Sequence, residues 1–239
     1  MSTQSEIIQY EQDGVSFEGH LVWDDSNAGP LPGVLVAHTW AGAGDFEKGR
    51  AEALAKLGYA GFAVDLYGKG RRGSSSEENA ALMQPLLDDR GLLQSRMSQG
   101  LRALRELDIV DSARVAAIGY CFGGLCVLDL ARTGADIAGV VSLHGLFPPP
   151  GNIAEPNITA KILALHGWDD PMVPPESVTA LAAELTGAGA DWQLHAYGHC
   201  VHAFTNPAAN DPEHGTVYDA VADRRSWQAT SNFLAEILG

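Results

Sequence analysis

The segment of residues 114–124 constrains the fold of this chain more than any other, because it combines a strand, a tight turn and a helix start. Its sequence is Arg-Val-Ala-Ala-Ile-Gly-Tyr-Cys-Phe-Gly-Gly. Glycines two residues before and two residues after Cys121 allow a strained backbone that packs tightly against strand and helix, where a side chain would clash. The pattern predicts a nucleophile elbow with sulfur in place of oxygen. The alternative is a cysteine buried as a small apolar residue.

Cys121 is expected at the N-terminus of a helix. Unpaired backbone N–H groups and the positive end of the helix dipole favour a thiolate there, and they leave donors free for an oxyanion. Cys126 lies five residues further along the same predicted helix and is expected in the core. Three cysteines form an odd and sparse set, with no spacing that indicates a disulfide framework or a zinc site. We therefore expect a reducing compartment.

Short apolar runs that are typical of buried strands alternate with helical segments of apolar periodicity along most of the chain. Strands are expected at residues 33–38, 59–64, 115–118, 137–143, 161–165 and 192–197, and helices at residues 46–57, 92–107, 121–131, 177–185 and 222–238. Right-handed crossovers between parallel strands place helices on both faces of a sheet. The alternation therefore predicts an α/β fold with a mostly parallel central sheet covered on both faces.

Two other segments depart from this alternation. Asp13-Gly14 separates apolar runs at residues 7–10 and 15–23, which predicts an antiparallel N-terminal hairpin. Residues 68–89 are polar and begin with a Gly/Ser-rich stretch, which predicts a surface excursion near the edge of the sheet.

Length and charge exclude several classes of function. The 239 residues, 46% of them hydrophobic, suffice for a sizeable core, and we expect one domain over residues 1–239. A formal net charge of -15 repels nucleic acid and anionic membranes, so neither is an expected partner. The sequence contains no apolar stretch long enough to span a bilayer and does not begin with a secretion signal, which predicts a cytoplasmic protein.

Six histidines follow or lie within predicted strands, namely His38, His144, His166, His195, His199 and His202. A metal centre at the carboxyl edge of the sheet is one interpretation. Ligands at matched spacing with carboxylate support are missing, however. His38, His144 and His166 each lie near a glycine-bearing turn, where a polar cap is enough. We expect structural hydrogen bonds from these three, no metal and no cofactor.

A thiol nucleophile needs a base and a third group that orients the base. Because reactive loops follow the carboxyl ends of strands, the candidates are side chains that come directly after apolar runs. Asp169 and Asp170 follow the run at residues 161–165, and His202 follows the run at residues 192–197. The chain order nucleophile, acid, histidine is that of the α/β-hydrolase arrangement.

On these residues the chain resembles the dienelactone hydrolase family of α/β-hydrolases, from residue 33 onward. The matching motifs are Gly167, Asp170, Val173 and Pro174 for Gly-x-x-Asp-x-x-Val-Pro, His202-Ala203-Phe204 after the last strand, and Asp65-Leu66-Tyr67 after an earlier one. The resemblance favours Asp170 over Asp169, and His202 over His195 and His199. It implies an α/β-hydrolase fold and a small ester or lactone as substrate.

The resemblance also implies a Cys121–His202–Asp170 triad that forms an acyl-enzyme. Its oxyanion hole would consist of two backbone N–H groups, those of Phe122 and Trp40. Loss of one such donor costs about 3 kcal/mol of transition-state stabilisation.

Two positions depart from the family pattern. Thr39 stands where dienelactone hydrolases carry a glutamate that interacts with the resting cysteine. Asn206 stands where they carry an arginine that binds the substrate carboxylate, and the lost clamp weighs against dienelactone itself as substrate. Thr39 and Asn206 form the predicted substrate pocket together with Tyr67 and Trp168, two aromatic residues in loops at the carboxyl edge of the sheet.

Three alternatives stay open at the level of sequence. A thioesterase or another acyl hydrolase would use the same triad. A pseudo-hydrolase would bind a small molecule without turnover, which the missing glutamate motivates. A redox-responsive protein would use an oxidation-prone Cys121.

Overall fold

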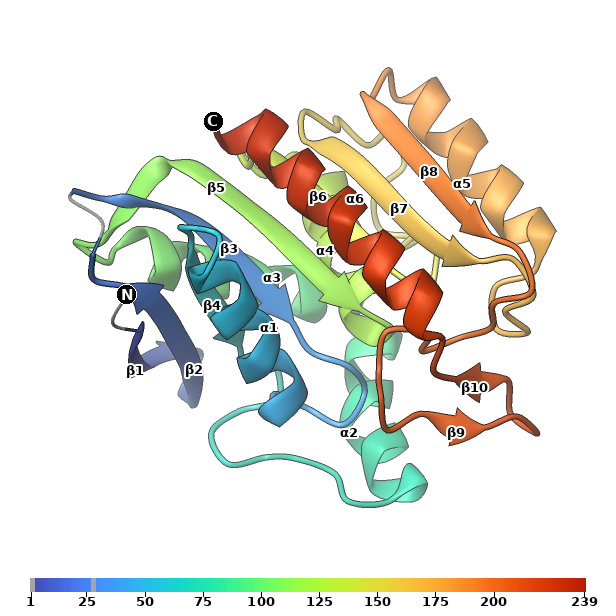
Figure 1. Ribbon diagram of the computed structural model, residues 1–239, viewed down its shortest axis with the longest axis horizontal. Helices are drawn as coiled ribbons and strands as arrows, with labels where there is room; N and C mark the ends of the chain where they lie inside the picture. The colour runs from blue at the N-terminus through green and yellow to red at the C-terminus, as the bar shows by residue number, and fades with distance from the viewer. Residues whose placement is uncertain (1–2, 27–28) are drawn as a thin grey trace. The chain divides into compact units, whose positions relative to one another are not determined.

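The structure is a computed structural model that describes residues 3–26 and 29–239. Its residues form two units, one up to Ile118 together with Leu238, the other Gly119–Ile237 together with Gly239. Figure 1 shows the strands and helices of both units. One domain over residues 1–239 stays a prediction.

The first unit contains the antiparallel N-terminal part of the sheet and three helices. Its strands are ordered β1-β2-β4-β3-β5. Its elements are β1 Thr3–Gln12, β2 Val15–Asp24, β3 Leu31–Ala37, α1 Asp45–Ala55, β4 Ala60–Val64, α2 Ser76–Asp88, α3 Arg90–Arg105 and β5 Val110–Tyr120, whose last two residues belong to the second unit.

The predicted N-terminal hairpin is confirmed. β1 and β2 pair antiparallel from Thr3 with Asp24 to the turn at Asp13 and Gly14, both of which have positive φ, 50° and 76°. β1 extends well beyond the predicted residues 7–10, and most of its side chains are exposed. An exposed strand needs no apolar alternation, so the pattern misses its ends.

Helices cover both faces of the first unit's sheet, as predicted. β3 and β4 pair in parallel. Gly61 and Val64 of β4 are three residues apart and so face opposite sides. A Cβ on Gly61 would lie 2.6 Å from the Ala51 oxygen of α1, and a Cβ on Gly100 of α3 would lie 2.4 Å from Val64. Helices α1 and α3 therefore pack on opposite faces of β4.

Helix α2 lies within residues 68–89, where the polar composition predicts a surface excursion. Its side chains are mostly exposed, in agreement with a surface position. The Ser75 hydroxyl oxygen caps the helix by accepting a hydrogen bond from the Glu78 N–H at 3.2 Å. This Ser-x-x-Glu spacing is a helix-start signal that the Gly/Ser content of the segment obscured.

The second unit contains three parallel strands in the order β6-β7-β8. Its elements are α4 Phe122–Arg132, β6 Gly139–Leu143, β7 Lys161–Gly167, α5 Pro175–Gly187, β8 Trp192–Tyr197, β9 Asn210–Asp211, β10 Thr216–Val217 and α6 Ala220–Leu238. The predicted strands and helices are confirmed within two residues at most ends. The two-residue strands β9 and β10 were not predicted, because so short a pair carries no periodicity.

The helices of this unit also lie on both faces of its strands (Figure 1). Gly139 and Ser142 of β6 point to opposite sides. A Cβ on Gly139 would meet Ile237 of α6 at 2.7 Å, and a Cβ on Gly124 of α4 would meet the Ser142 hydroxyl at 2.7 Å. Helices α6 and α4 therefore cover opposite faces of β6. With the first unit, this confirms a mostly parallel sheet with helices on both faces.

A buried arginine joins three segments of the second unit. Arg132 ends α4 and is 2% exposed. Its guanidinium donates to both carboxylate oxygens of Glu184 in α5 at 2.7 and 2.8 Å, to Asp129 at 3.2 Å and to the Phe147 carbonyl at 3.0 Å. Bidentate pairing and carbonyl acceptors compensate for burial of the charge and hold the loop after β6 in place.

No helix of the described residues combines the length and the apolar character needed to cross a membrane.

Candidate active site

The turn between β5 and α4 has the geometry of a nucleophile elbow. Cys121 has φ 55° and ψ -116°, a region that residues other than glycine rarely adopt. A Cβ on Gly119 would lie 2.0 Å from the Gly123 oxygen, and a Cβ on Gly124 would lie 2.6 Å from the Gly145 Cα. Close contact therefore requires glycine at position 119, as the sequence predicted, and also at position 124, one residue beyond the predicted Gly123.

Cys121 stands at the start of α4 and differs from the other two cysteines in exposure. It is the N-cap residue and is partly exposed, whereas Cys126 is buried in the core as predicted. Cys200 is also buried, and burial together with the nearby Asp219 charge raises the pKa of its thiol to about 12. Cys200 is thus a protonated thiol at neutral pH. Phe122 begins α4, and the backbone N–H groups of a first helical turn point out of the end of the helix.

The structure brings Asp170 and His202 together. The His202 Nδ1 and the Asp170 Oδ2 are 2.7 Å apart, and both side chains are almost fully buried. The other carboxylate oxygen of Asp170 accepts the Met172 N–H at 2.8 Å. Asp169 instead lies 3.6 Å from His199 on the surface. The pair that the resemblance favoured is the buried one.

The charge of Cys121 acts on His202. Burial lowers the pKa of His202, but the negative charge of Cys121 and the hydrogen bond with Asp170 raise it to about 10. Cys121 thus lies near enough for its charge to act on the imidazole, and no described group forms a hydrogen bond with the buried Nε2. This nitrogen is available for proton exchange.

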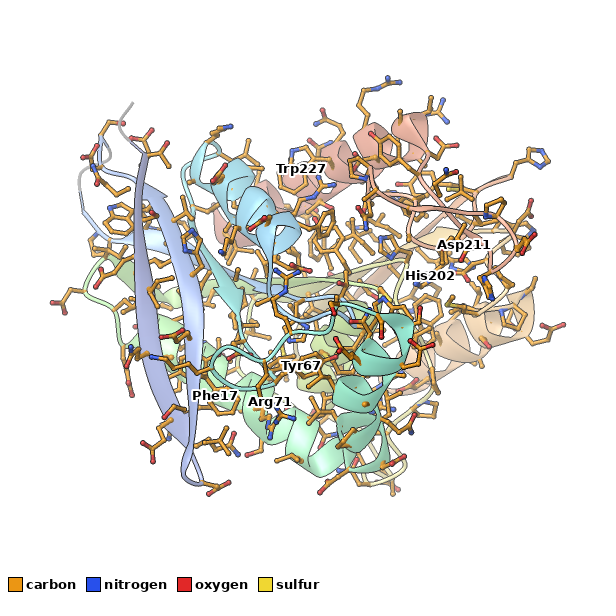
Figure 2. The ribbon with its side chains drawn as sticks, turned by 90° about the horizontal axis from the view of Figure 1, so that it is seen from below. Phe17, Tyr67, Arg71, His202, Asp211 and Trp227 are labelled. Carbon is orange, nitrogen blue, oxygen red and sulfur yellow. The ribbon has the colours of Figure 1, made fainter. Side chains whose placement is uncertain are left out.

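The loop that carries His202 is held by backbone hydrogen bonds. Its N–H donates to the Gly215 carbonyl at 2.9 Å, and its carbonyl accepts the Val217 N–H at 3.1 Å. Figure 2 shows His202 beside the segment of β9 and β10, on which Asp211 is labelled. Ala203, the next residue, has φ 58°. The short strands thus fix a strained loop around the imidazole.

Three predicted site residues lie in the first unit. The Thr39 N–H donates to the buried Glu47 carboxylate at 3.1 Å, so the loop after β3 is anchored to α1. The Tyr67 hydroxyl donates to the Trp40 carbonyl at 2.9 Å, and Tyr67 is buried. Figure 2 labels Tyr67 with its neighbour Arg71, which donates to the Tyr67 carbonyl. A shared oxyanion hole of Trp40 and Phe122 stays a prediction.

The two other predicted pocket residues lie in the second unit. Trp168 is 43% exposed directly before the two aspartates. The Asn206 side-chain oxygen accepts the Ala208 N–H at 3.0 Å and so caps a local turn. Asn206 therefore has a structural role in the His202 loop, and contact of either residue with substrate stays a prediction.

A cavity of about 620 Å³ in the second unit was not predicted from the sequence. Its walls include Phe147, Pro148, Ile153, Met172 and Leu181. Met172 also donates to Asp170, so one wall adjoins the buried carboxylate. Mostly apolar walls of this size suit an apolar part of a small molecule.

Two of the three histidines expected to form structural hydrogen bonds do so, but the prediction is wrong for His166, whose buried ring nitrogens have no hydrogen-bond partner among the described residues. His38 is buried, accepts the Leu66 N–H at 3.2 Å and contacts the Thr39 carbonyl at 2.6 Å. His144 accepts the Cys121 N–H at 3.1 Å, a contact with the elbow that the sequence did not predict. Its partner lies 23 residues away, so no local pattern could have found the contact.

Known proteins match the chain over most of its length. Residues 17–238 match the model of the dienelactone hydrolase family. The crystal structure of a dienelactone hydrolase-like promiscuous phosphotriesterase from metagenomic libraries is 36% identical, with a TM-score of 0.93 and 100% of both chains covered. This similarity, together with the observed sheet, confirms the predicted α/β-hydrolase fold.

Relatives from animals and bacteria also match. An uncharacterized protein of Caenorhabditis elegans is 37% identical over 155 residues, which cover 62% of this chain and 96% of that protein. A Yersinia pestis protein named as a candidate carboxymethylenebutenolidase is 25% identical over 227 residues, which cover 90% of this chain and 82% of that protein.

Proposed function

Because the chain belongs to the dienelactone hydrolase family and is an ester-bond hydrolase, we propose that it cleaves a small carboxylic ester or lactone through Cys121, His202 and Asp170. The reaction would pass through an acyl-enzyme on Cys121. A cytoplasmic location and a small soluble substrate are part of this proposal.

One observation carries the proposal more than any other. A partly exposed cysteine in a strained elbow raises the pKa of a buried histidine, which is hydrogen-bonded to a buried aspartate. A raised pKa keeps His202 protonated at neutral pH, which favours a thiolate–imidazolium pair at rest. Strain at Cys121 and burial of the other two groups are features of a site rather than of ordinary core packing.

The first half of the reaction follows from this charge state. The Cys121 thiolate attacks the carbonyl carbon, and the carbonyl electron pair moves to the oxygen to form a tetrahedral oxyanion. Backbone N–H groups of Phe122 and Trp40 would stabilise that oxygen. When the oxyanion collapses, the bond to the leaving oxygen breaks, and His202 Nε2 gives its proton to the leaving alkoxide.

The second half restores the enzyme. Neutral His202 takes a proton from water, whose oxygen attacks the thioester carbon. Collapse of the second tetrahedral oxyanion expels the Cys121 thiolate and releases the acid, and His202 keeps the proton. Asp170 holds the imidazole in one tautomer and orientation in both halves.

The two departures from the family pattern shape the substrate preference. Asn206 lacks the positive charge that would bind a substrate carboxylate, and its side chain caps a turn. We therefore expect uncharged esters and lactones to be preferred over dienelactone. Thr39 cannot act as a base, so activation of Cys121 depends on His202.

A phosphotriester is the second candidate substrate. The observation that favours it is the whole-chain similarity, at 36% identity, to the dienelactone hydrolase-like promiscuous phosphotriesterase. A thiolate can attack a phosphorus centre and expel an aryloxide as it does at carbon. Thioesters would use the same triad, and matched oxygen and sulfur esters would separate these activities.

Mass spectrometry of the intact protein tests the proposal. Incubation with short p-nitrophenyl esters, simple lactones and an aryl phosphotriester is expected to add one acyl or phosphoryl group at Cys121. Cys121→Ala is expected to lose both adduct and turnover, whereas Cys200→Ala, which removes a buried and protonated thiol, is expected to keep them. Full turnover by Cys121→Ala would contradict the proposal. A ligand bound intact with no release of leaving group would instead identify a pseudo-hydrolase.

A further inference from the structure

We propose that His144 is a positioning residue, which couples the Cys121 elbow to the His202 loop through Thr205. The inference rests on the proposed function, because it assigns His144 a role in aligning the two reacting side chains. His144 lies directly after β6 and is part of neither the Cys121 elbow nor the His202 loop.

Hydrogen bonds on both sides of the His144 ring support the coupling. The Cys121 N–H is shared between the His144 Nδ1 and the Leu143 carbonyl, each at 3.1 Å. On the other side, the His144 Nε2 lies 2.8 Å from the Thr205 hydroxyl oxygen. Thr205 follows His202 by three residues, so a single imidazole bridges the nucleophile turn and the histidine loop.

These contacts determine the tautomer of His144. A backbone N–H can only donate, so the Nδ1 that accepts from Cys121 carries no proton. The proton is then on Nε2, which donates it to the Thr205 hydroxyl. His144 is therefore neutral, and proton exchange with substrate is left to His202.

Packing holds the bridge rigid. His144 is 1% exposed and Thr205 is fully buried. The His144 ring lies edge-on to the His202 ring at 5.2 Å and to the Phe204 ring at 5.1 Å, with Tyr120 at 6.0 Å. The contact with His202 limits rotation of the His202 imidazole.

The backbone of His144 is unusual in the same way as that of Cys121. Its φ is 38°, in the left-handed region that residues other than glycine seldom adopt. A hydrogen bond thus joins two residues of positive φ, one of which carries the nucleophile. Such conformations persist where surrounding contacts determine them, and the bridge through His144 supplies contacts of this kind.

Variants at Thr205 test the coupling. Thr205→Val removes the acceptor of the His144 proton at nearly constant volume, and we expect kcat with p-nitrophenyl acetate to fall about tenfold to a hundredfold with KM changed less than about twofold. Thr205→Ser keeps the hydroxyl and is expected to restore kcat to within about threefold of wild type. The rate of Cys121 alkylation by iodoacetamide, measured by mass spectrometry, is likewise expected to fall in Thr205→Val and to recover in Thr205→Ser.

Thr230→Val is the matched control. Thr230 is equally buried, and its hydroxyl donates to the Ser226 carbonyl within α6 at 2.9 Å. Thr230→Val removes one buried hydroxyl hydrogen bond without affecting His144, so kcat and the rate of Cys121 alkylation are expected to stay at wild-type values. Equal losses in both valine variants would indicate general destabilisation and overturn the inference.

A double variant sharpens the test. His144→Asn retains a side-chain acceptor near the Cys121 N–H and tolerates positive φ, but it is too short to reach Thr205. Combined with Thr205→Val, it is expected to reduce kcat no further than the more severe single variant, because both remove the same contact. Multiplied losses would overturn the inference. Wild-type kcat and a wild-type alkylation rate in Thr205→Val, with Cys121→Ala inactive, would also overturn the inference. Full activity of Cys121→Ala would instead contradict the proposed function.

Discussion

Two adjacent aspartates of the second unit face two histidines in opposite environments. Asp170 and His202 are 2.7 Å apart with side chains 0% and 2% exposed, whereas Asp169 and His199 are 3.6 Å apart with side chains 50% and 101% exposed. The residue types are identical and the chain positions nearly so. The difference shows that burial, rather than the presence of a carboxylate and an imidazole, separates a candidate catalytic pair from a surface contact.

Water explains why the two pairs differ. Around His199, solvent screens the attraction and solvates each group by itself. Around His202, little water competes, so the hydrogen bond with Asp170 and the charge of Cys121 raise the pKa of His202 to about 10 against the effect of burial. The buried pair can therefore fix the orientation of an imidazole and help the charge of Cys121 to keep it protonated, whereas the exposed pair can do neither.

Matched amide substitutions provide the largest test of the comparison. Asp170→Asn keeps the shape of the side chain but removes the charge that orients protonated His202, and we expect kcat to fall about 10³- to 10⁴-fold. Asp169→Asn is expected to leave kcat within about twofold of wild type. Steady-state kinetics with p-nitrophenyl acetate measures both. Similar losses in the two variants would mean that burial does not distinguish the pairs.

Removal of one partner should separate the pairs in stability as well. Asp170→Ala leaves a buried imidazolium without its carboxylate, which costs about 3–5 kcal/mol in the free energy of unfolding. Asp169→Ala removes only an exposed contact and is expected to leave that free energy nearly unchanged. Urea unfolding followed by circular dichroism gives both values. If Asp170→Ala unfolds at the wild-type urea concentration, the buried pair has no structural role.

The pH dependence of stability provides a further measurement. The folded-state pKa of His202, about 10, is above its ordinary value of 6.5. Its protonated form therefore contributes fully to stability below about pH 6.5, and this contribution is lost as the pH rises through about 10. Between about pH 8 and pH 10.5, wild-type protein is expected to lose more unfolding free energy than His202→Gln, which lacks the titrating group. Parallel curves would exclude the raised pKa.

Local patterns predicted the parts of the site that depend on neighbouring residues. The elbow follows from glycines at fixed offsets from Cys121, because the steric requirement lies within a few residues. The hairpin at Asp13-Gly14 is local in the same sense. Helix α2 has a local capping signal at Ser75, but the Gly/Ser-rich stretch before it is typical of a loop, so composition does not predict this helix.

Other features of the site depend on contacts between residues far apart in the sequence, which local patterns cannot predict. Periodicity alone could not distinguish Asp170 from Asp169, since both directly follow one strand and only the tertiary fold buries the first. The family motif, not the residue pattern, made that distinction. The link from His144 to Thr205 spans 61 residues and has no signal in either segment. The cavity beside Met172 is likewise a product of loop packing.

The smallest expected effect belongs to the exposed pair. His199→Gln removes a group that contacts Asp169 across 3.6 Å in full solvent, so the melting temperature is expected to change by less than about 2 °C and kcat to stay at the wild-type value. His199 has φ 61°, a conformation that histidine adopts more readily than glutamine, so a small part of any change in melting temperature reflects the backbone rather than the lost contact. Differential scanning calorimetry and kinetics on the same preparation check both expectations. A large loss of kcat would show that the surface histidine affects the His202 loop, three residues further along the chain, and that exposure alone does not separate the two pairs.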